Sequence, residues 1–211
     1  MDRHDPDFIP AKIHALALQG ARIGLLGGSF NPAHEAHVHV SLVALRRLKL
    51  DAVWWLVSPQ NPLKPQTGMA PLAQRLARAR EVAGTHPQLV ASAPEVMLGT
   101  RFTLDTLKAL STSLPGARFV WLMGGDSMAS FHRWRRWPEI MACMPVAVVA
   151  RPGFTVRALT SPAATRMASA RVRSTEQLFR SGTPAWIYLE ERLDPTSATA
   201  IRAQGKWSTT A

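Results

Sequence analysis

The sequence predicts an α/β domain in which a mostly parallel sheet carries helices on both of its faces. Short, continuously apolar runs recur along the chain, as expected of strands that are buried on both sides. Segments with apolar residues at helical spacing separate these runs. This alternation is typical of parallel sheets, and right-handed crossovers place the strand-to-helix loops at one edge, where ligands bind.

Five apolar runs are expected to form strands. They are residues 22–27 (RIGLLG), 52–58 (AVWWLVS), 118–124 (RFVWLMG), 145–150 (PVAVVA) and 185–191 (AWIYLEE). None approaches the length of about 20 apolar residues that a membrane span needs, so we expect no membrane association.

Helical patterns lie between these runs. The expected apolar faces are Val38, Leu42, Leu45 and Leu48 in the first helix and Leu72, Leu76, Ala79 and Ala83 in the second. Arg75, Arg78 and Arg80 lie between the apolar positions of the second helix, and Arg75 is expected to be a solvated charge. Residues 103–114 predict a third helix with Thr103 as its cap, and 194–205 a last helix.

The length of 211 residues suits one domain. We expect residues 1–20 to form an N-terminal extension without the layout of a secretory signal, 21–205 a single domain, and 206–211 a tail. Within the domain, 151–184 hold six arginines and one acid, Glu176. This segment predicts a loop with one weak helix, either a mobile insertion or a helical segment.

The composition is strongly basic, with a formal net charge of +11. Such a charge is compatible with nucleic acid, an anionic membrane or phosphorylated substrates. The basic residues form no long tract, and RWRR at 133–136 is too short to indicate nucleic-acid binding. The single cysteine, Cys143, excludes an internal disulfide and is compatible with a reducing cytoplasm. We therefore expect a cytoplasmic protein.

The stretch GLLGGSFNPAHEAHVHVS, residues 24–41, carries the strongest chemical signal. Gly27 and Gly28 are expected to let the chain bend and a ligand approach. Ser29 and Phe30 would present backbone N–H groups, and the following helix would point its positive end at a phosphate.

His34 and His37 are three residues apart and therefore share one helix face. Two imidazoles at such a helix start can donate hydrogen bonds to phosphate oxygens and stabilise charge in a transition state. Two simpler interpretations stay open: a tight strand-to-helix turn, and a zinc site, for which no third ligand is evident nearby. The loop matches neither G-x-G-x-x-G nor a P-loop.

The segment GGSFNPAHEAH, residues 27–37, resembles the G-G-[ST]-F-[ND]-P-x-H-x-G-H motif of the nucleotidylyltransferase superfamily, and more narrowly of nicotinate-nucleotide adenylyltransferases. Further resemblances follow in order across residues 22–205. They are SPQNPLKP (58–65), RFTLDTL (101–107), GGDSMASFHRWRRWPEI (124–140), ARPG (150–153) and TSATAIR (196–202).

The resemblance implies a Rossmann-like nucleotidylyltransferase fold with a small C-terminal helical part. It also implies a role in NAD biosynthesis: transfer of the adenylyl group of ATP to nicotinate mononucleotide, with Mg²⁺ entering with ATP. The expected partners are these two small molecules and no nucleic acid, and the protein would be a monomer or a homo-oligomer.

The resemblance also assigns roles to residues. The catalytic set would be His34, His37, Lys64 and Arg202. ATP would contact Gly27, Gly28, Ser29, Phe30, His34, His37, Asp126, Ser197, Thr199 and Arg202. Nicotinate mononucleotide would contact Ser29, Lys64, Thr103, Trp134 and Arg151. No protein residue is expected to bind a metal directly.

Some roles and identities stay open. Trp134 could instead pack in the core, with Trp137 taking its place, and Asp126 could merely cap a helix. Ala36 and Ala198 replace residues that are common in the motifs, and Phe102 replaces a tyrosine. Only nine residues follow Arg202, which could affect oligomerisation. The rival readings are phosphopantetheine adenylyltransferase, a basic nucleic-acid-binding protein and a non-catalytic metabolite sensor.

Overall fold

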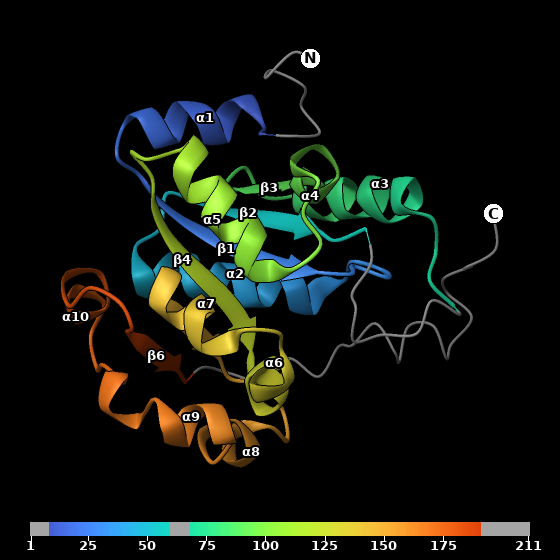
Figure 1. Ribbon diagram of the computed structural model, residues 1–211. Helices are drawn as coiled ribbons and strands as arrows, with labels where there is room; N and C mark the ends of the chain where they lie inside the picture. Colours follow the sequence, from blue (N-terminus) through green and yellow to red (C-terminus); the bar gives the residue numbers. More distant parts are fainter. Residues whose placement is uncertain (1–8, 60–67, 191–211) are drawn as a thin grey trace.

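Six parallel strands form one sheet in the computed structural model, which describes residues 9–59 and 68–190 (Figure 1). The strand order is β3–β2–β1–β4–β5–β6. The strands are β1 Arg22–Gly28, β2 Ala52–Val57, β3 Leu89–Ser92, β4 Arg118–Gly124, β5 Val146–Val149 and β6 Trp186–Leu189. The predicted Rossmann-like α/β class is thus confirmed.

All five predicted strands are present, each within a few residues of its expected bounds. The sixth, β3, was missed because its four residues, LVAS, end in a polar serine and form no continuous apolar run, unlike the equally short β5 and β6. The strand order reverses beside β1: β2 and β3 follow on one side of it, and β4, β5 and β6 on the other. In open α/β sheets, ligands bind outside the carboxyl ends of the strands at such a switch point.

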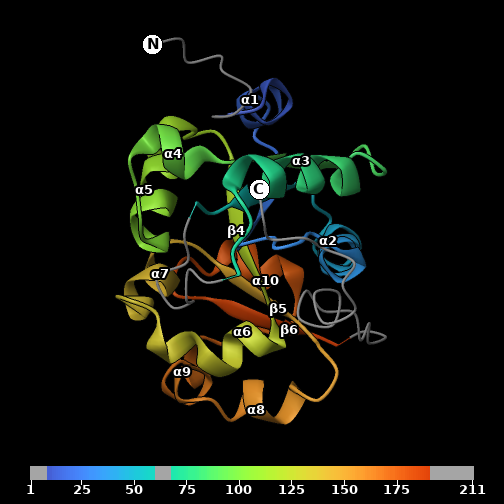
Figure 2. The ribbon, with the colours of Figure 1, turned by 90° about the vertical axis from the view of Figure 1, so that its right-hand side faces the viewer.

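The helices cover both faces of the sheet. They are α1 Ala11–Leu18, α2 Glu35–Leu48, α3 Leu72–Ala83, α4 Pro94–Leu98, α5 Thr103–Ser113, α6 Gly125–Ser130, α7 Trp137–Cys143, α8 Thr155–Leu159, α9 Pro162–Arg166 and α10 Thr175–Arg180, with 3₁₀ turns η1 Phe131–Arg133 and η2 Ala168–Ala170. Figure 2 shows α5 and α7 on one side of the sheet and α2 on the other. Within the described chain, no helix is long and apolar enough to cross a membrane.

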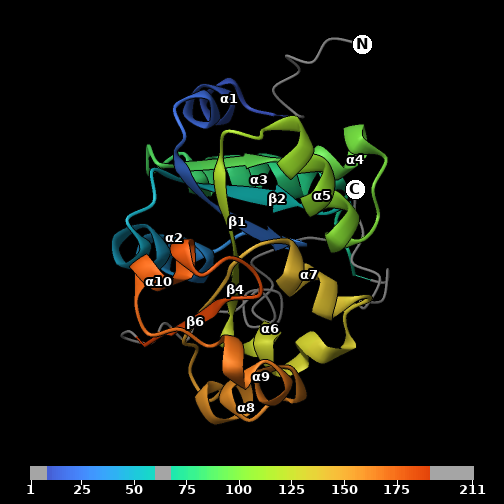
Figure 3. The same cartoon turned by 60° about the vertical axis from the view of Figure 1, so that its left-hand side comes forward.

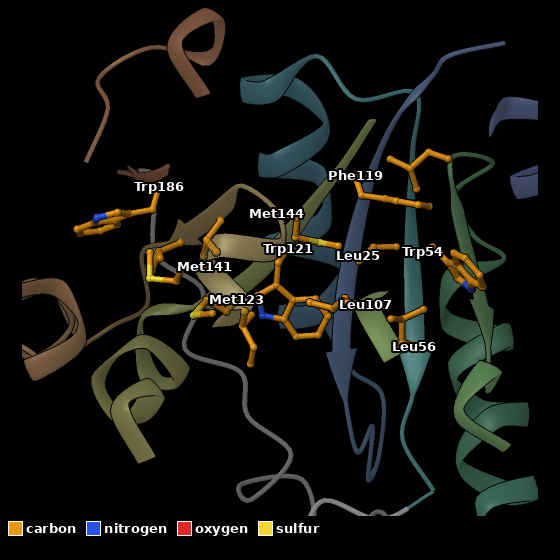
Figure 4. Close-up of a cluster of buried hydrophobic side chains, with 14 of the residues drawn as sticks. Leu25, Trp54, Leu56, Leu107, Phe119, Trp121, Met123, Met141, Met144 and Trp186 are labelled. Carbon is orange, nitrogen blue, oxygen red and sulfur yellow. The ribbon is translucent and has the colours of Figure 1, made fainter. Parts of the chain in front are cut away.

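Side chains alternate between two core layers along every central strand. In β1, Leu25 packs in the layer beneath α1, α5 and α7, whereas Leu26 packs in the layer with α2, α3 and α10. Figure 4 shows the first layer, where Leu25, Trp54 and Trp121 lie together. The buried positions of β1, β2, β4 and β5 are apolar in both layers, which explains the continuous apolar runs.

The second layer ties the last helix to the first crossover helix. Figure 3 shows α10 beside α2, and Thr175 Oγ1 donates a 2.8 Å hydrogen bond to the carbonyl of Arg47. The segment 151–184 contains three short helices, α8, α9 and α10, where the sequence predicted one weak helix. Short Ser-capped turns account for the difference, since Ser161 and Ser174 each accept a backbone N–H at a helix start.

Two local predictions were wrong. Leu42 is 38% exposed, because Val40, Val43 and Ala44 complete the buried face of α2 in its place. Thr103 does not cap α5: the helix begins at Thr103, after Phe102, and shows no side-chain cap. Within the expected N-terminal extension, α1 buries Ile13 and Ala17 in the core.

Gly27 and Gly28 do not bend the chain, which corrects the reason given for them. Both continue the strand, in register with Leu56 and Val57 of β2. Gly27 is required by space, because a Cβ there would overlap Cη2 of the Trp121 indole, which reaches from β4 toward β1. Gly28 is less constrained, since its nearest neighbour would be Phe30 Cε2 at 3.3 Å.

Gly27→Ala should therefore destabilise the protein by about 1–3 kcal/mol, the usual cost of overpacking a tight core. Chemical denaturation measures the loss. Gly28→Ala is the matched control and should cost less. Trp121→Phe in the Gly27→Ala background should recover part of the loss, and equal losses with and without the indole would contradict the packing argument.

Candidate active site

The start of α2 brings His34 and His37 together at the carboxyl end of β1. Their ring centroids are 4.0 Å apart. His34 is the N-cap residue, and its Nδ1 accepts a 3.2 Å hydrogen bond from the Ala36 N–H. His37 Nδ1 accepts a 3.2 Å bond from the His34 N–H, so each ring caps the backbone beside the other. The predicted pairing is confirmed as geometry.

These hydrogen bonds fix where the protons sit. Because both Nδ1 atoms accept from backbone N–H groups, each neutral imidazole carries its proton on Nε2. Both rings therefore become Nε2–H donors at the positive end of a 14-residue helix. Ala36 lies inside the helical turn, where any residue adopts the backbone conformation, so its replacement of glycine leaves the pair in place.

Phe30 supports the histidine pair from behind. Its ring is 2% exposed, stacks on Trp55 with centroids 5.1 Å apart, and tilts against His37 at 4.6 Å. Its φ is +46°, a left-handed conformation that a bulky residue rarely adopts and that costs about 1–3 kcal/mol. Phe30 is thus a buried support of His37.

Arg75 corrects another expectation: its side chain is not solvated but 1% exposed. Burial lowers the pKa of its guanidinium from the ordinary value. The group donates to four carbonyls, those of Ser29 (2.6 Å), Ser58 (2.7 Å), Pro59 (2.8 Å) and Ala70 (2.8 Å). It therefore joins the chain after β1 to the chain after β2.

A pocket opens beside the glycines of β1. It encloses about 640 Å³, including space open to solvent. Its lining combines aromatic walls with a few polar groups, as ligand pockets do. The lining residues are Gly27, Gly28, Ser58, Glu95, Arg101, Phe102, Thr103, Trp121, Trp134, Arg135 and Ile140.

The pocket separates the roles of two tryptophans. Trp134 lines it and contacts Phe131 and Trp121 edge-on, with centroids 5.3 and 6.3 Å apart. Trp137 contacts Phe131 from elsewhere, with Arg166 over its ring, and is absent from the lining among the described residues. Thr103 also lines the pocket, at the first residue of α5.

Charge is unevenly distributed in this pocket. Arg135 lies 4.4 Å above the Phe102 ring, and Arg101 lies 5.8 Å from the same centroid, so the aromatic ring orients both cations. Glu95 accepts a 3.0 Å hydrogen bond from Ser58 Oγ. Burial raises the pKa of Glu95 to about 7, against the smaller opposing effect of that hydrogen bond.

Asp126 and Arg151 contact each other, with Nε and Oδ1 3.9 Å apart. Asp126 lies in the first turn of α6, directly after β4, and its side chain is 42% exposed. Neither belongs to the lining of the aromatic pocket, so the predicted mononucleotide contact of Arg151 gains no support from it. Ser29 is 5% exposed, with its Oγ unpartnered among the described residues.

Four of the predicted site residues lie outside the described residues: Lys64, Ser197, Thr199 and Arg202. The expected contacts of these residues with the substrates therefore stay predictions. Across residues 9–59 and 68–190, no three His, Cys, Asp or Glu side chains gather as a metal site, so the histidine pair has no third ligand there.

Sequence reasoning missed several pocket residues. No pattern in the sequence distinguishes Glu95, Arg101 or Arg135 from surface charges. Phe102 and Ser58 were quoted within motifs but received no role. For Arg75 a signal existed: the helical spacing that places Leu72, Leu76 and Ala79 inward also places position 75 beside them.

Comparisons with known proteins find similar sequences over most of the chain. The family described as cytidylyltransferase-like matches residues 25–204. A "probable nicotinate-nucleotide adenylyltransferase" of Cereibacter sphaeroides is 55% identical over 185 residues, which cover 88% of this chain and 98% of that protein. A protein of the same name from Roseobacter denitrificans is 48% identical over 193 residues, covering 90% of this chain and 96% of the relative.

A solved structure is also similar. Plasmodium falciparum nicotinic acid mononucleotide adenylyltransferase, complexed with APC, superposes with a TM-score of 0.62. It is 15% identical and covers 87% of this chain and 83% of its own, so it supports the fold alone. The same protein is also known complexed with NaAD.

Glu95 should make stability depend on pH in a defined direction. Its pKa of about 7 lies above the value for an exposed glutamate, so the folded state binds the extra proton between about pH 4.5 and 7. The free energy of unfolding should therefore fall by about 1–3 kcal/mol as the pH rises through this window.

Urea denaturation at pH 5 and pH 8 measures this change. Glu95→Gln removes the titration and should flatten the difference between the two pH values. Glu81→Gln, at a side chain that is 69% exposed, is the control and should leave the difference as in the unmodified protein. An equal pH dependence with and without the Glu95 carboxyl would contradict this reading.

Proposed function

The chain belongs to the nicotinate-nucleotide adenylyltransferase family, within the cytidylyltransferase-like proteins, and we propose that it transfers the adenylyl group of ATP to nicotinate mononucleotide. The products are nicotinate adenine dinucleotide and pyrophosphate, so the enzyme acts in NAD biosynthesis. It is a nucleotidyltransferase.

One observation carries the proposal at the level of chemistry: the end of β1 lines an aromatic pocket, and the loop that follows it leads to two Nε2–H donors at the start of α2. Donors at a helix start suit a polyphosphate, and a pocket walled by Trp134 and Phe102 suits a flat ring. Gly27 and Gly28, at the end of β1, line the pocket. They have no side chains there to separate a bound ring from the loop that leads to the histidines.

In the proposed reaction, a phosphate oxygen of the mononucleotide attacks the α-phosphorus of ATP in line. The bond from the α-phosphorus to the bridging oxygen breaks, and pyrophosphate leaves with that electron pair. No covalent enzyme intermediate is needed, so the protein supplies positioning and charge stabilisation. His34 and His37 hold the α- and β-phosphates, and His37 stabilises the charge that develops in the transition state.

The pyridine end occupies the aromatic pocket in this proposal. Trp134 stacks on the nicotinate ring, and Thr103 with nearby backbone amides meets the carboxylate at the start of α5. The guanidinium groups of Arg101 and Arg135, both held over the Phe102 ring, make the same pocket favourable for an anionic substituent on the pyridine ring. Ser29, beside the histidines, contacts both substrates.

The remaining roles follow the resemblance. Lys64 contacts the phosphates. Arg202, with Ser197 and Thr199, binds the triphosphate. Asp126 contacts the ribose or adenosine of ATP, and Arg151 the mononucleotide. We further propose a cytoplasmic enzyme, monomeric or homo-oligomeric, that binds no nucleic acid.

Mg²⁺ fits this site as a substrate-borne ion. The described residues offer single carboxylates rather than a cluster, and Mg²⁺ commonly binds substrate phosphates and water with few protein ligands. When bound, it neutralises charge on the triphosphate.

A pyrophosphate-release assay with ATP, Mg²⁺ and a panel of acceptors tests the function. We expect nicotinate mononucleotide to react faster than the amide mononucleotide, and 4′-phosphopantetheine to be inert, since the relatives carry the nicotinate name. Faster turnover of the amide or of phosphopantetheine would overturn the proposed substrate.

His37→Ala should lower kcat by about 10²–10³-fold, the loss expected for one transition-state donor. Steady-state kinetics on the folded variant measures it, with circular dichroism to confirm the fold. His39→Ala is the matched control on the same helix, and it should keep near-full turnover. A His37→Ala enzyme as active as the His39 control would remove His37 from the mechanism.

A further inference from the structure

Arg75 makes an unusual set of contacts for a buried cation. Its guanidinium is almost fully enclosed, yet its hydrogen-bond acceptors are four backbone carbonyls, and no ion pair joins it to an acid within the described chain. A buried charge without a carboxylate is costly unless its donors are satisfied. A simple core position of α3 would be filled more cheaply by leucine.

The acceptors show what the guanidinium holds. One nitrogen, Nη1, donates to the carbonyls of both Ser29 and Ser58, at 2.6 and 2.7 Å. Ser29 directly follows β1 and Ser58 directly follows β2, so one group joins the two loops that leave adjacent strands. The planar fork of arginine can serve several acceptors in fixed directions, which a lysine cannot do.

The Ser29 carbonyl leads to the histidine pair. It belongs to the peptide unit that joins Ser29 to Phe30, and Phe30 holds a left-handed φ of +46°. The Phe30 ring lies between Trp55 and His37, so the orientation of this peptide decides where the ring supports His37. A hydrogen bond from a fixed buried donor stabilises an orientation that the phenylalanine alone would not favour.

The Ser58 carbonyl leads to the pocket. Ser58 lines the pocket and donates through Oγ to Glu95, so the same serine is held at its backbone by Arg75 and at its side chain by Glu95. Arg75 therefore contacts two parts of the site through backbone carbonyls: the loop that leads to the histidine pair, at Ser29, and the lining of the pocket, at Ser58.

We propose that Arg75 is a positioning residue for adenylyl transfer. It fixes the Ser29–Phe30 peptide, and through the Phe30 ring it holds His37 where its Nε2–H meets the reacting phosphates. This inference rests on the proposed function for its kinetic consequence but not for its structural one.

The kinetic test compares Arg75→Met and Arg75→Lys with the unmodified enzyme, with rates expressed per folded molecule. Misplacing a catalytic donor should lower kcat by about 10–100-fold, with a smaller change in the KM for either substrate. Lysine keeps the charge but not the fork, so it should stay impaired. Arg78→Met, at an exposed neighbour on α3 paired with Glu81, should behave as the unmodified enzyme. Unchanged kcat per folded molecule, or full recovery with lysine, would overturn the proposal.

A double-mutant cycle with His37→Ala tests the route of the effect. If Arg75 acts through His37, Arg75→Lys should lower kcat by less than about threefold in the His37→Ala background, against the full loss in the unmodified background. Equal losses in both backgrounds would show that Arg75 does not act through His37.

A readout without substrate separates this inference from the proposed function. Nitrogen-15 spectra of the histidine side chains should show His37 as an Nε2–H tautomer with an accepting Nδ1. In Arg75→Lys the two nitrogen shifts of His37 should move toward averaged values. If the unmodified chain transfers no adenylyl group, this arm still decides the role of Arg75; an unchanged His37 spectrum would refute it.

Discussion

The candidate site depends on the hydrogen bonds that the backbone carbonyls accept where the chain continues beyond β1 and β2. Carbonyls at these points are buried and need donors. Arg75 supplies them from α3, and holds the loop after β1 next to the loop after β2. Everything placed on the first loop follows from this: Phe30 in its left-handed conformation, the stack on Trp55, and the histidine pair that begins α2.

The structural role of the histidines bears directly on the chemical role that we propose for them. Each Nδ1 caps the backbone of α2, so the atoms that hold the helix start also decide that Nε2 carries the proton. The donor arrangement is therefore preorganised before substrate arrives, which is what makes electrostatic stabilisation effective. Trp55 adds to this order, because its indole N–H reaches Ser41, whose hydroxyl donates to the His37 carbonyl.

Close packing at the middle of the sheet shapes the other half of the site. The Trp121 indole occupies the space that a side chain at Gly27 would fill, and the same tryptophan forms a wall of the pocket beside Trp134. A glycine that looks like a hinge in the sequence is thus a packing partner. Because Gly27 has no side chain, the Trp121 indole can pack in the core and also form a wall of the pocket. The stability of the protein and the shape of the pocket therefore depend on the same contact.

The sequence by itself determined five of the six strands, the two longest helices, the fold class, the family and the histidine pair, because apolar periodicity and a contiguous motif are local signals. Only the tertiary structure decided that Arg75 is buried, that Glu95 and Arg135 share a pocket with Thr103 and Trp134, and that Trp137 does not. These residues come from three successive crossovers, those between β2 and β3, between β3 and β4, and between β4 and β5. Their positions relative to one another depend on the order of the strands and on which backbone carbonyls lack donors. Neither can be predicted from the residue spacing within a single segment.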